Sequence, residues 1–538
     1  MRKTHVRVLF CVALLVAAAA SILQVRAQTY SVKYSLGSVS GDPLSPSWAL
    51  VAQGRDGNLY STAPKGGTLG NGAVFMITPS GTLSVLYDFD VTHGSLPYGG
   101  LTLGTDGNLY GTTYQGGTAA SGTIFKITPT GTLTVLHNLG SGEGSSPYGA
   151  PIQGADGNFY GTTYNGGNGY GSVYKLTPAN VFTALYKFDN THGGQPHAPL
   201  VQGTDGALYG TTYSGGTLGY GTVFKVTTAG VETVLYNFDS THGANPFGPL
   251  MQGADGNFYG TTYSGGSGSG VVFKITSAGV LTVLHNLNGG SDGGGSFVGL
   301  VQVNDGSLYG VAQRGGSNFV GAIFRITTSG TYSVLHSFDR PAGDTPQVTL
   351  LEHTTGTLYG TTFEGGTGSG GVVYSLKNGL GAFVRPLLTS GKVGKSIGIL
   401  GQGFTGTTSV AFNGTSATFA VSTDTYLTAT IPNLATTGLV TVITPGGKLT
   451  SLRKVRVTPV ITSFSPTSGT VGTPVVITGN SLTQTSKVTF GGVKATTMTV
   501  NSDTQVTANV PTGAVTGKIA ITTPGGTATS STVFTVLP

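Results

Sequence analysis

Short runs of alternating apolar and polar residues, separated by glycine-rich turns, make up most of the chain from about residue 30 onward. The stretch from Ala198 to Asp239 holds four apolar-rich segments, Pro199–Gln202, Ala207–Tyr213, Gly221–Val226 and Val231–Phe238. Alternation with a period of two is typical of β-strands that bury one face. Glycine and β-branched residues interrupt the windows in which an amphipathic helix could form. The pattern therefore predicts an all-β protein.

This four-segment unit recurs along the first two thirds of the chain. Its Tyr-Gly-Thr-Thr core stands at Tyr110, Tyr160, Tyr209, Tyr259 and Tyr359, with weaker copies at Tyr60 and Tyr309, so that successive tyrosines are 49 or 50 residues apart. Four antiparallel strands in about 50 residues, repeated in tandem, are typical of the blade of a β-propeller. Six Asp-Gly turns and Thr355-Gly356 in the seventh unit indicate seven blades. Asp-Gly between short strands favours a type I′ hairpin.

An additional outer strand precedes the first complete unit. Ser31–Leu36 has the pattern of the fourth strand, as seen in Thr233–Phe238, and it has no blade before it to follow. Without a partner, Gly371–Leu376 of the last unit would remain an exposed edge, and open edges invite aggregation. We therefore expect the N-terminal strand to complete the last blade and close the ring. Val32, Tyr34 and Leu36 should include its buried side chains.

From about Leu380 the period changes to roughly 78 residues. Ser390-Gly391 matches Ser468-Gly469, and Thr444–Gly447 matches Thr523–Gly526. Short Val/Ile/Thr strands with frequent turns are typical of small β-sandwiches. The expected organisation is a signal peptide (1–27), a propeller (28–380) and two Ig-like sandwiches (381–458 and 459–538).

The N-terminus has the pattern of an export signal. Arg2, Lys3 and Arg7 precede the apolar run Val8–Leu23, and Ala27 ends a small-residue cleavage site. The run is short for a membrane span, which needs about 20 residues. Cleavage would remove four basic and no acidic residues, lowering the formal net charge from +6 to +2, together with Cys11, the only cysteine. We expect an exported protein, extracellular, at the cell surface or in the periplasm, with no membrane span after cleavage. We expect no nucleic-acid partner, cofactor or bound metal.

Two resemblances to known families support this organisation. Ile461–Gly472, followed by Ile477-Thr-Gly479 and Thr523–Gly526, resembles the IPT/TIG immunoglobulin-like domain, and the segment 381–458 is a more divergent copy. Residues 30–380 resemble the GloVer tandem repeat of exported bacterial proteins through Gly-Asn-Leu-Tyr-Gly-Thr-Thr and Val-Phe-Lys-Ile-Thr. The resemblance implies no catalytic set of residues.

The candidate binding residues follow from blade geometry. The loop after the second strand and the loop after the fourth strand open on the same face of a propeller blade. These loops carry candidate ligand-binding residues, namely Tyr114, Tyr164, Tyr213, Tyr263, Phe363, His192 and His242. Aromatic rings and hydrogen-bonding groups together suit the stacking of sugar rings. The alternative is that these side chains only fill gaps between blades.

The sequence therefore favours a non-enzymatic binding or surface protein. The propeller face would recognise an extracellular glycan or protein, and the sandwiches would act as spacer or adhesion modules. The alternative is a secreted polysaccharide-processing enzyme, a hydrolase or lyase, with its active site on the propeller face. No catalytic residue is assigned. Oligomeric state and ligand identity are left open.

Overall fold

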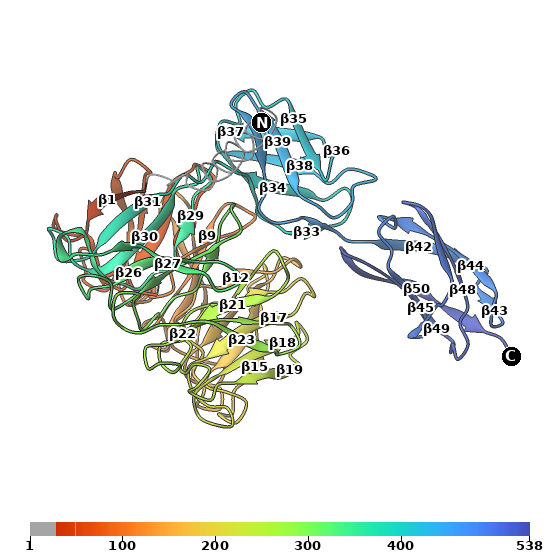
Figure 1. The fold of residues 1–538 in the computed structure, drawn as a ribbon, viewed down its shortest axis with the longest axis horizontal. Coiled ribbons are helices and arrows are strands. Elements are labelled where there is room, and N and C mark those ends of the chain that lie inside the picture. Colours follow the sequence, from red (N-terminus) through yellow and green to blue (C-terminus); the bar gives the residue numbers. More distant parts are fainter. Residues whose placement is uncertain (1–27, 49) are drawn as a thin grey trace, which may run out of the picture.

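The computed structural model describes residues 28–48 and 50–538, so the expected signal peptide lies outside the described residues. Within the described part, the chain forms β-sheets and one short 3-10 turn, η1 (Arg340–Ala342). Figure 1 shows a propeller followed by two separate β-sandwiches. The prediction of an all-β propeller with two Ig-like sandwiches is confirmed.

Five of the seven blades, blades 2 to 6, are formed by four consecutive strands ordered from the channel outward, and blade 1 differs only in that β5 lies outside it. Blade 1 contains β3 (Ala52–Gln53), β4 (Leu59–Ala63), β6 (Ala73–Ile77) and β7 (Leu83–Asp88). Blade 2 contains β8 (Thr102–Leu103), β9 (Leu109–Thr113), β10 (Thr123–Ile127) and β11 (Leu133–Asn138), and blade 3 contains β12 (Ile152–Gln153), β13 (Phe159–Thr163), β14 (Ser172–Leu176) and β15 (Phe182–Lys187). Blade 4 contains β16 (Val201–Gln202), β17 (Leu208–Thr212), β18 (Thr222–Val226) and β19 (Glu232–Asn237). Blade 5 contains β20 (Met251–Gln252), β21 (Phe258–Thr261), β22 (Val271–Ile275) and β23 (Leu281–Asn286), and blade 6 contains β24 (Val301–Gln302), β25 (Leu308–Ala312), β26 (Ala322–Ile326) and β27 (Tyr332–Ser337). A short pair, β2 (Pro43–Leu44) and β5 (Lys65–Gly66), lies beside blade 1.

The last blade is completed by the N-terminus, as expected. It contains β28 (Asp344–Pro346), β29 (Leu351–Glu352), β30 (Leu358–Glu364) and β31 (Val372–Lys377), and β1 (Thr29–Ser35) pairs antiparallel with β31. Tyr30 stacks on His336 of blade 6 at 3.9 Å, and Leu36 is fully buried. Val32 is 37% exposed, so the expected burial holds for Leu36 but not for Val32. A bulge between Val32 and Tyr34 shifts the register at that point.

Each residue of the repeated motif has a structural role, as blade 5 shows. The Asp255 carboxylate accepts hydrogen bonds from the backbone N–H of Asn257 (3.1 Å) and from the buried Tyr259 hydroxyl (2.8 Å). Gly260 is required because a Cβ there would lie 2.6 Å from the Phe273 ring. The Thr261 hydroxyl donates to a backbone carbonyl of the next blade, that of Val298, at 2.6 Å. The motif therefore builds the scaffold.

The turn at each Asp-Gly pair differs from the expected type I′ hairpin. In blade 4, Gly206 has a φ of +85° whereas Asp205 has no positive φ. The N–H of Gly206 donates to the Gly203 carbonyl, and the N–H of Gly203 donates to the Ala207 carbonyl. This is the three-residue loop in which a type I turn is followed by a left-handed glycine. The Asp carboxylate stabilises the loop by accepting from the Tyr209 hydroxyl at 2.8 Å.

Glutamines on the innermost strands join neighbouring blades. The Gln202 side chain accepts from the Ala155 N–H of blade 3 at 2.9 Å and donates to the Gly206 carbonyl of its own turn at 3.0 Å. Gln153, Gln252 and Gln302 make the same pair of bonds. Because an amide both donates and accepts, one side chain links two backbones. In blade 7 the equivalent residue is Glu352.

The two sandwiches have matching sheets. The first contains β32 (Arg385–Pro386), β34 (Ser396–Leu400), β38 (Tyr426–Thr430) and β37 (Phe419–Thr423), packed on β36 (Thr415–Ser416), β35 (Ser409–Phe412), β39 (Val440–Thr444) and β40 (Gly447–Thr450), with β33 (Ser390–Gly391) parallel to β41 (Arg456–Val457). The second contains β42 (Val460–Ser465), β44 (Pro474–Asn480), β48 (Gln505–Asn509) and β47 (Met498–Ser502), packed on β43 (Ser468–Gly469), β50 (Gly526–Val536), β49 (Gly517–Thr523), β45 (Lys487–Phe490) and β46 (Val493–Lys494). Each encloses its own apolar core.

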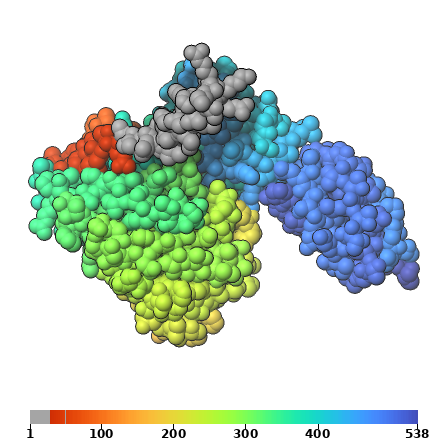
Figure 2. All heavy atoms as spheres, viewed as in Figure 1, coloured from red at the N-terminus to blue at the C-terminus, as the bar shows by residue number. Residues whose placement is uncertain are grey.

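The first sandwich docks on the face of the propeller that carries the Asp-Gly turns, which we call the turn face. The Thr425 hydroxyl donates to the Arg55 carbonyl of blade 1 at 2.6 Å, and the Arg55 guanidinium lies 4.4 Å from the centre of the Tyr426 ring. On the far side, Arg453 and Arg456 donate to carbonyls of blades 5 and 4. The second sandwich projects away from the propeller (Figure 2).

Candidate functional site

The opposite face of the propeller, which we call the loop face, carries the loops that leave the second and fourth strands. In the loop before blade 5, Asn245 has a left-handed φ of +54° although it is not glycine. Its N–H donates to the Tyr220 carbonyl (2.9 Å), and its carbonyl accepts from the Tyr263 N–H (3.2 Å). Leu96, Ser146 and Gln195 occupy the same position with φ values of +54° to +56°. This conformation is sparsely populated, so the loops are held by their surroundings.

Two residues after each of these four positions stands a ring, namely Tyr98, Tyr148, His197 or Phe247. Trp48 contacts Tyr148 (5.3 Å) and His197 (6.3 Å) in addition to its two neighbours, so it packs against four of the other five rings. With Trp48 and Phe297, six rings form a circle at the mouth of the channel. Their ring centres are 5.0 Å apart for Trp48–Tyr98, 5.3 Å for Tyr98–Tyr148, 4.4 Å for Tyr148–His197, 4.4 Å for His197–Phe247, 4.6 Å for Phe247–Phe297 and 6.4 Å for Phe297–Trp48. They come from six successive repeats. Each of the six rings is half-buried, so each keeps some accessible surface.

Four of the predicted tyrosines surround this circle. Tyr114 contacts Tyr98 and Tyr148, and each following tyrosine likewise contacts two neighbouring members of the circle; these are Tyr164, Tyr213 and Tyr263. Most of these pairs are tilted or edge-to-face, which is the favoured arrangement of aromatic rings. We call these ten residues the aromatic cluster.

The aromatic cluster has polar atoms as well as rings. In the described part of the chain, Trp48 Nε1, His197 Nδ1 and the neighbouring Gln313 Oε1 are buried without a hydrogen-bond partner. Burial lowers the pKa of His197 to about 3, so the imidazole is neutral at physiological pH. Burial, followed by its tyrosine neighbours, raises the pKa of Tyr148, which keeps its hydroxyl protonated. The ten rings themselves are therefore uncharged, the unpartnered polar atoms are buried within the cluster, and the Arg314 guanidinium lies 5.7 Å from the centre of the Tyr263 ring.

The remaining predicted residues lie apart from the cluster. His192 and His242 are exposed in their own turns, where their Nδ1 atoms lie 2.8 and 2.6 Å from the carboxylates of Asp189 and Asp239. The hydrogen bond that the His192 ring donates to the Asp189 carboxylate raises the pKa of His192. Phe363 borders a separate depression of about 660 Å³, with Lys65 Nζ 5.7 Å above its ring. Of the seven residues predicted from the sequence, the structure therefore brings four together.

Sequence reasoning missed the six members of the inner circle. A signal for them exists, because an aromatic residue or histidine follows proline at Tyr98, Tyr148, His197 and Phe247 with the same period as the Tyr-Gly-Thr-Thr motif. The loop after the second strand directly follows the Tyr-Gly-Thr-Thr motif, so its aromatic residues are easier to recognise in the sequence. Trp48 stands two residues after Pro46, so it does not share the Pro-aromatic spacing of the other repeats.

Two further observations concern the described residues only. Among residues 28–48 and 50–538, no three His, Cys, Asp or Glu side chains gather in a way that could hold a metal ion. The same residues contain no helix that is long and apolar enough to cross a membrane.

The fold defines the class of protein, a seven-bladed β-propeller followed by Ig-like sandwiches. The model of the Gloeobacter/Verrucomicrobia repeat matches residues 45–269 and 229–419, and the chain belongs to this family. The IPT/TIG domain model matches residues 459–536, which form the second sandwich. No curated protein matches the chain in this comparison.

Several solved structures are similar in fold. A fungal alcohol oxidase of the AA5 family, in complex with copper, is 15% identical, with 80% of this chain and 100% of that chain covered and a TM-score of 0.47. A gluconolactonase from Xanthomonas campestris is 13% identical over 50% of this chain and 81% of that one, with a TM-score of 0.34. A surface glycan-binding protein from Prevotella bryantii is 20% identical over 28% of this chain and 41% of that one, with a TM-score of 0.23. None of these similarities bears on the chemistry of the site.

Proposed function

We propose that this protein is an exported binding protein whose aromatic cluster recognises extracellular glycan chains. The observation that carries the proposal is the cluster of ten half-buried rings at the channel mouth, which neighbouring repeats bring into contact. Sugars present apolar C–H faces that pack on aromatic rings and hydroxyls that pair with donors and acceptors.

The rest of the chain supports the same function. The N-terminal pattern of basic residues followed by an apolar run suits export. The docked first sandwich covers the turn face and leaves the loop face free of it, while the second sandwich extends outward as a spacer or adhesion module.

The test is a glycan array with the secreted chain, with release of reducing sugar measured in parallel. We expect Tyr213→Ala combined with Tyr263→Ala to weaken glycan binding at least about ten-fold, since each lost aromatic contact is worth about 0.5–1.5 kcal/mol beyond burial. The matched control is Tyr186→Ala combined with Tyr236→Ala, which removes two half-buried tyrosines from outer strands. We expect this control to retain binding.

Three outcomes would contradict the proposal. If the Tyr213/Tyr263 variant unfolds, these rings serve packing, and the surface loses its main support. If the chain binds a protein instead of any glycan, the partner class is wrong. Sugar release that persists in the purified protein would favour the polysaccharide-processing alternative.

A further inference from the structure

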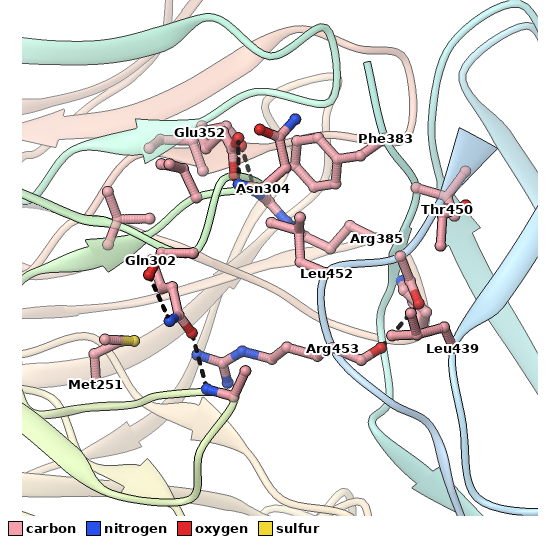
Figure 3. A pocket seen from close by; sticks show the side chains of 18 of the residues that line it. Met251, Gln302, Asn304, Glu352, Phe383, Arg385, Leu439, Thr450, Leu452 and Arg453 are labelled. Atoms are coloured by element: carbon pink, nitrogen blue, oxygen red, sulfur yellow. Dashed lines mark hydrogen bonds between the residues drawn. The ribbon is translucent and has the colours of Figure 1, made fainter. Parts of the chain in front are cut away.

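A second cavity lies between the turn face of the propeller and the first sandwich (Figure 3). Its volume is about 800 Å³, within the range of small-molecule sites. The propeller contributes inner-strand residues of blades 5 to 7, including Met251, Leu300 and Leu350. The first sandwich contributes Phe383 and Leu452. Most of the lining is therefore apolar.

Three cations and a single carboxyl group line this cavity: Arg385, Lys448, Arg453 and Glu352. Arg385 and Arg453 reach from the sandwich toward the propeller in Figure 3. Arg385 donates to the backbone carbonyl of Glu352, and Arg453 donates to that of Gln252 at 3.0 Å. Among the described residues, neither guanidinium has a carboxylate within ion-pair distance. Burial lowers the pKa of Arg385 to about 10.

Glu352 attracts Arg385, but a single carboxyl group cannot balance three cations. It is fully buried and occupies the position that glutamine holds in blades 1 and 3 to 6. Its Oε1 accepts from the Asn304 N–H at 3.4 Å, whereas its Oε2 has no partner in the described part of the chain. Burial raises the pKa of Glu352 to about 7. Near neutral pH this carboxyl group is therefore only partly ionised, and the cavity has an excess of positive charge.

Guanidinium groups removed from bulk water without a counter-ion are unfavourable. A bound anion would supply the missing charge, and a carboxylate or sulfonate matches the planar donor array of arginine. The apolar lining would cover the rest of such a ligand. We propose that this cavity binds a small organic anion, with its carboxylate or sulfonate at Arg385 and Arg453 and its apolar body beside Leu300, Leu350 and Phe383. This site is independent of the aromatic cluster on the opposite face.

The test uses the full chain and 4-phenylbutyrate as the probe, with the uncharged 4-phenyl-1-butanol for comparison. We expect calorimetry to show saturable binding of the anion at the cavity, with the alcohol at least about 30-fold weaker because it lacks the charge that the guanidinium groups recognise. Arg453→Gln should weaken binding of the anion by about the same factor.

The matched control is Arg456→Gln. Arg456 also docks the first sandwich, by donating to the Thr204 carbonyl, but it does not line the cavity. We expect this variant to bind 4-phenylbutyrate as the unmodified chain does. Equal losses in both arginine variants would assign the effect to domain docking and overturn the proposal. Absence of binding in the unmodified chain, or equal binding of acid and alcohol, would also overturn it. A loss caused by Tyr213→Ala and Tyr263→Ala would place the probe on the loop face instead.

Discussion

The two faces of the propeller are built from the same seven repeats, yet they differ in what they present. The loop face carries long glycine-rich loops that bring ten rings together around the channel. The turn face carries tight Asp-Gly turns, whose backbone carbonyls accept hydrogen bonds from the Thr425 hydroxyl and the Arg456 guanidinium of the first sandwich. Loop length and side-chain size thus decide which face is available to a ligand, because the strands of the blades are the same for both.

The two sandwiches also share one fold, yet only the first is docked on the propeller. Ser451 and Ser530 occupy equivalent positions and make the same bond, to the carbonyl two residues on, at 2.9 and 2.7 Å. Two residues after Ser451 stands Arg453, which binds the propeller, whereas Thr532 stands two residues after Ser530. The same backbone therefore docks in one copy and remains separate in the other. Docking therefore depends on particular side chains, such as Arg453 and Thr425, and not on the sandwich fold.

The largest effect on stability is expected from deleting β1, the N-terminal strand that closes the ring and so supports both faces. Deleting Gln28–Gly37 removes β1 from the last blade, together with the buried Leu36 and the stacking of Tyr30 on His336. We expect a loss of at least about 5 kcal/mol from two large buried side chains and one row of backbone bonds, comparable with the whole stability of a domain. Thermal unfolding followed by circular dichroism would measure it.

Val32→Thr provides the control for this deletion. Val32 lies on the same strand but is exposed, and threonine keeps its shape. We expect this variant to melt within about one degree of the unmodified chain, as exposed substitutions usually do. A melting temperature left unchanged by the deletion would show that β1 does not close the ring.

A smaller effect is expected from uncovering the turn face. A chain that ends at Lys377 lacks the first sandwich and the segment in which Leu380 and Phe383 are buried. We expect its propeller to fold but to lose about 3–6 kcal/mol, the contribution that burial of these two large apolar side chains makes in the full chain. A chain that ends at Thr458 keeps these contacts and lacks only the second sandwich. We expect it to match the full chain, and equal melting of both truncations would contradict the docking.

The smallest effect is expected at a single residue of the turn face. Because burial raises the pKa of Glu352 to about 7, the folded state binds its proton more tightly than the unfolded state does. The contribution of Glu352 to stability is therefore full below about pH 4.5 and is lost as the pH rises through 7. Between pH 5 and pH 8, the unmodified chain should therefore lose about 2–3 kcal/mol of its free energy of unfolding. We expect this loss to be absent in Glu352→Gln, because glutamine does not ionise. Urea titrations at several pH values would measure it.

Glu232→Gln is the matched comparison for this pH effect. Burial also raises the pKa of Glu232 to about 7, but this residue is only half-buried, on the outer strand of blade 4. Solvent screens it more than it screens Glu352, so its substitution should change the pH dependence less. An unchanged pH dependence in Glu352→Gln would show that this carboxyl group is ionised in the folded protein at no cost.

Much of the fold could be predicted from the sequence because each repeat is a local unit. The 50-residue period, the turn residues and the extra N-terminal strand determine the number of blades and how the ring closes. The candidate site was predictable in part, since Tyr114, Tyr164, Tyr213 and Tyr263 follow a visible motif. Phe363 has the same register, yet in the structure it lies beside Lys65. Register alone does not specify which side chains meet.

The sequence by itself determined the strands, the seven-fold repetition and the division between propeller and sandwiches, because these depend on periods of 2, 50 and 78 residues along one chain. Only the tertiary structure decided that Trp48 meets Phe297, that Arg453 reaches Gln252, and that Glu352 is buried beside a cavity. These contacts join residues about 50 to 250 positions apart. The physical reason is that ring closure and domain docking bring such residues together, and neither leaves a local pattern of apolar and polar positions.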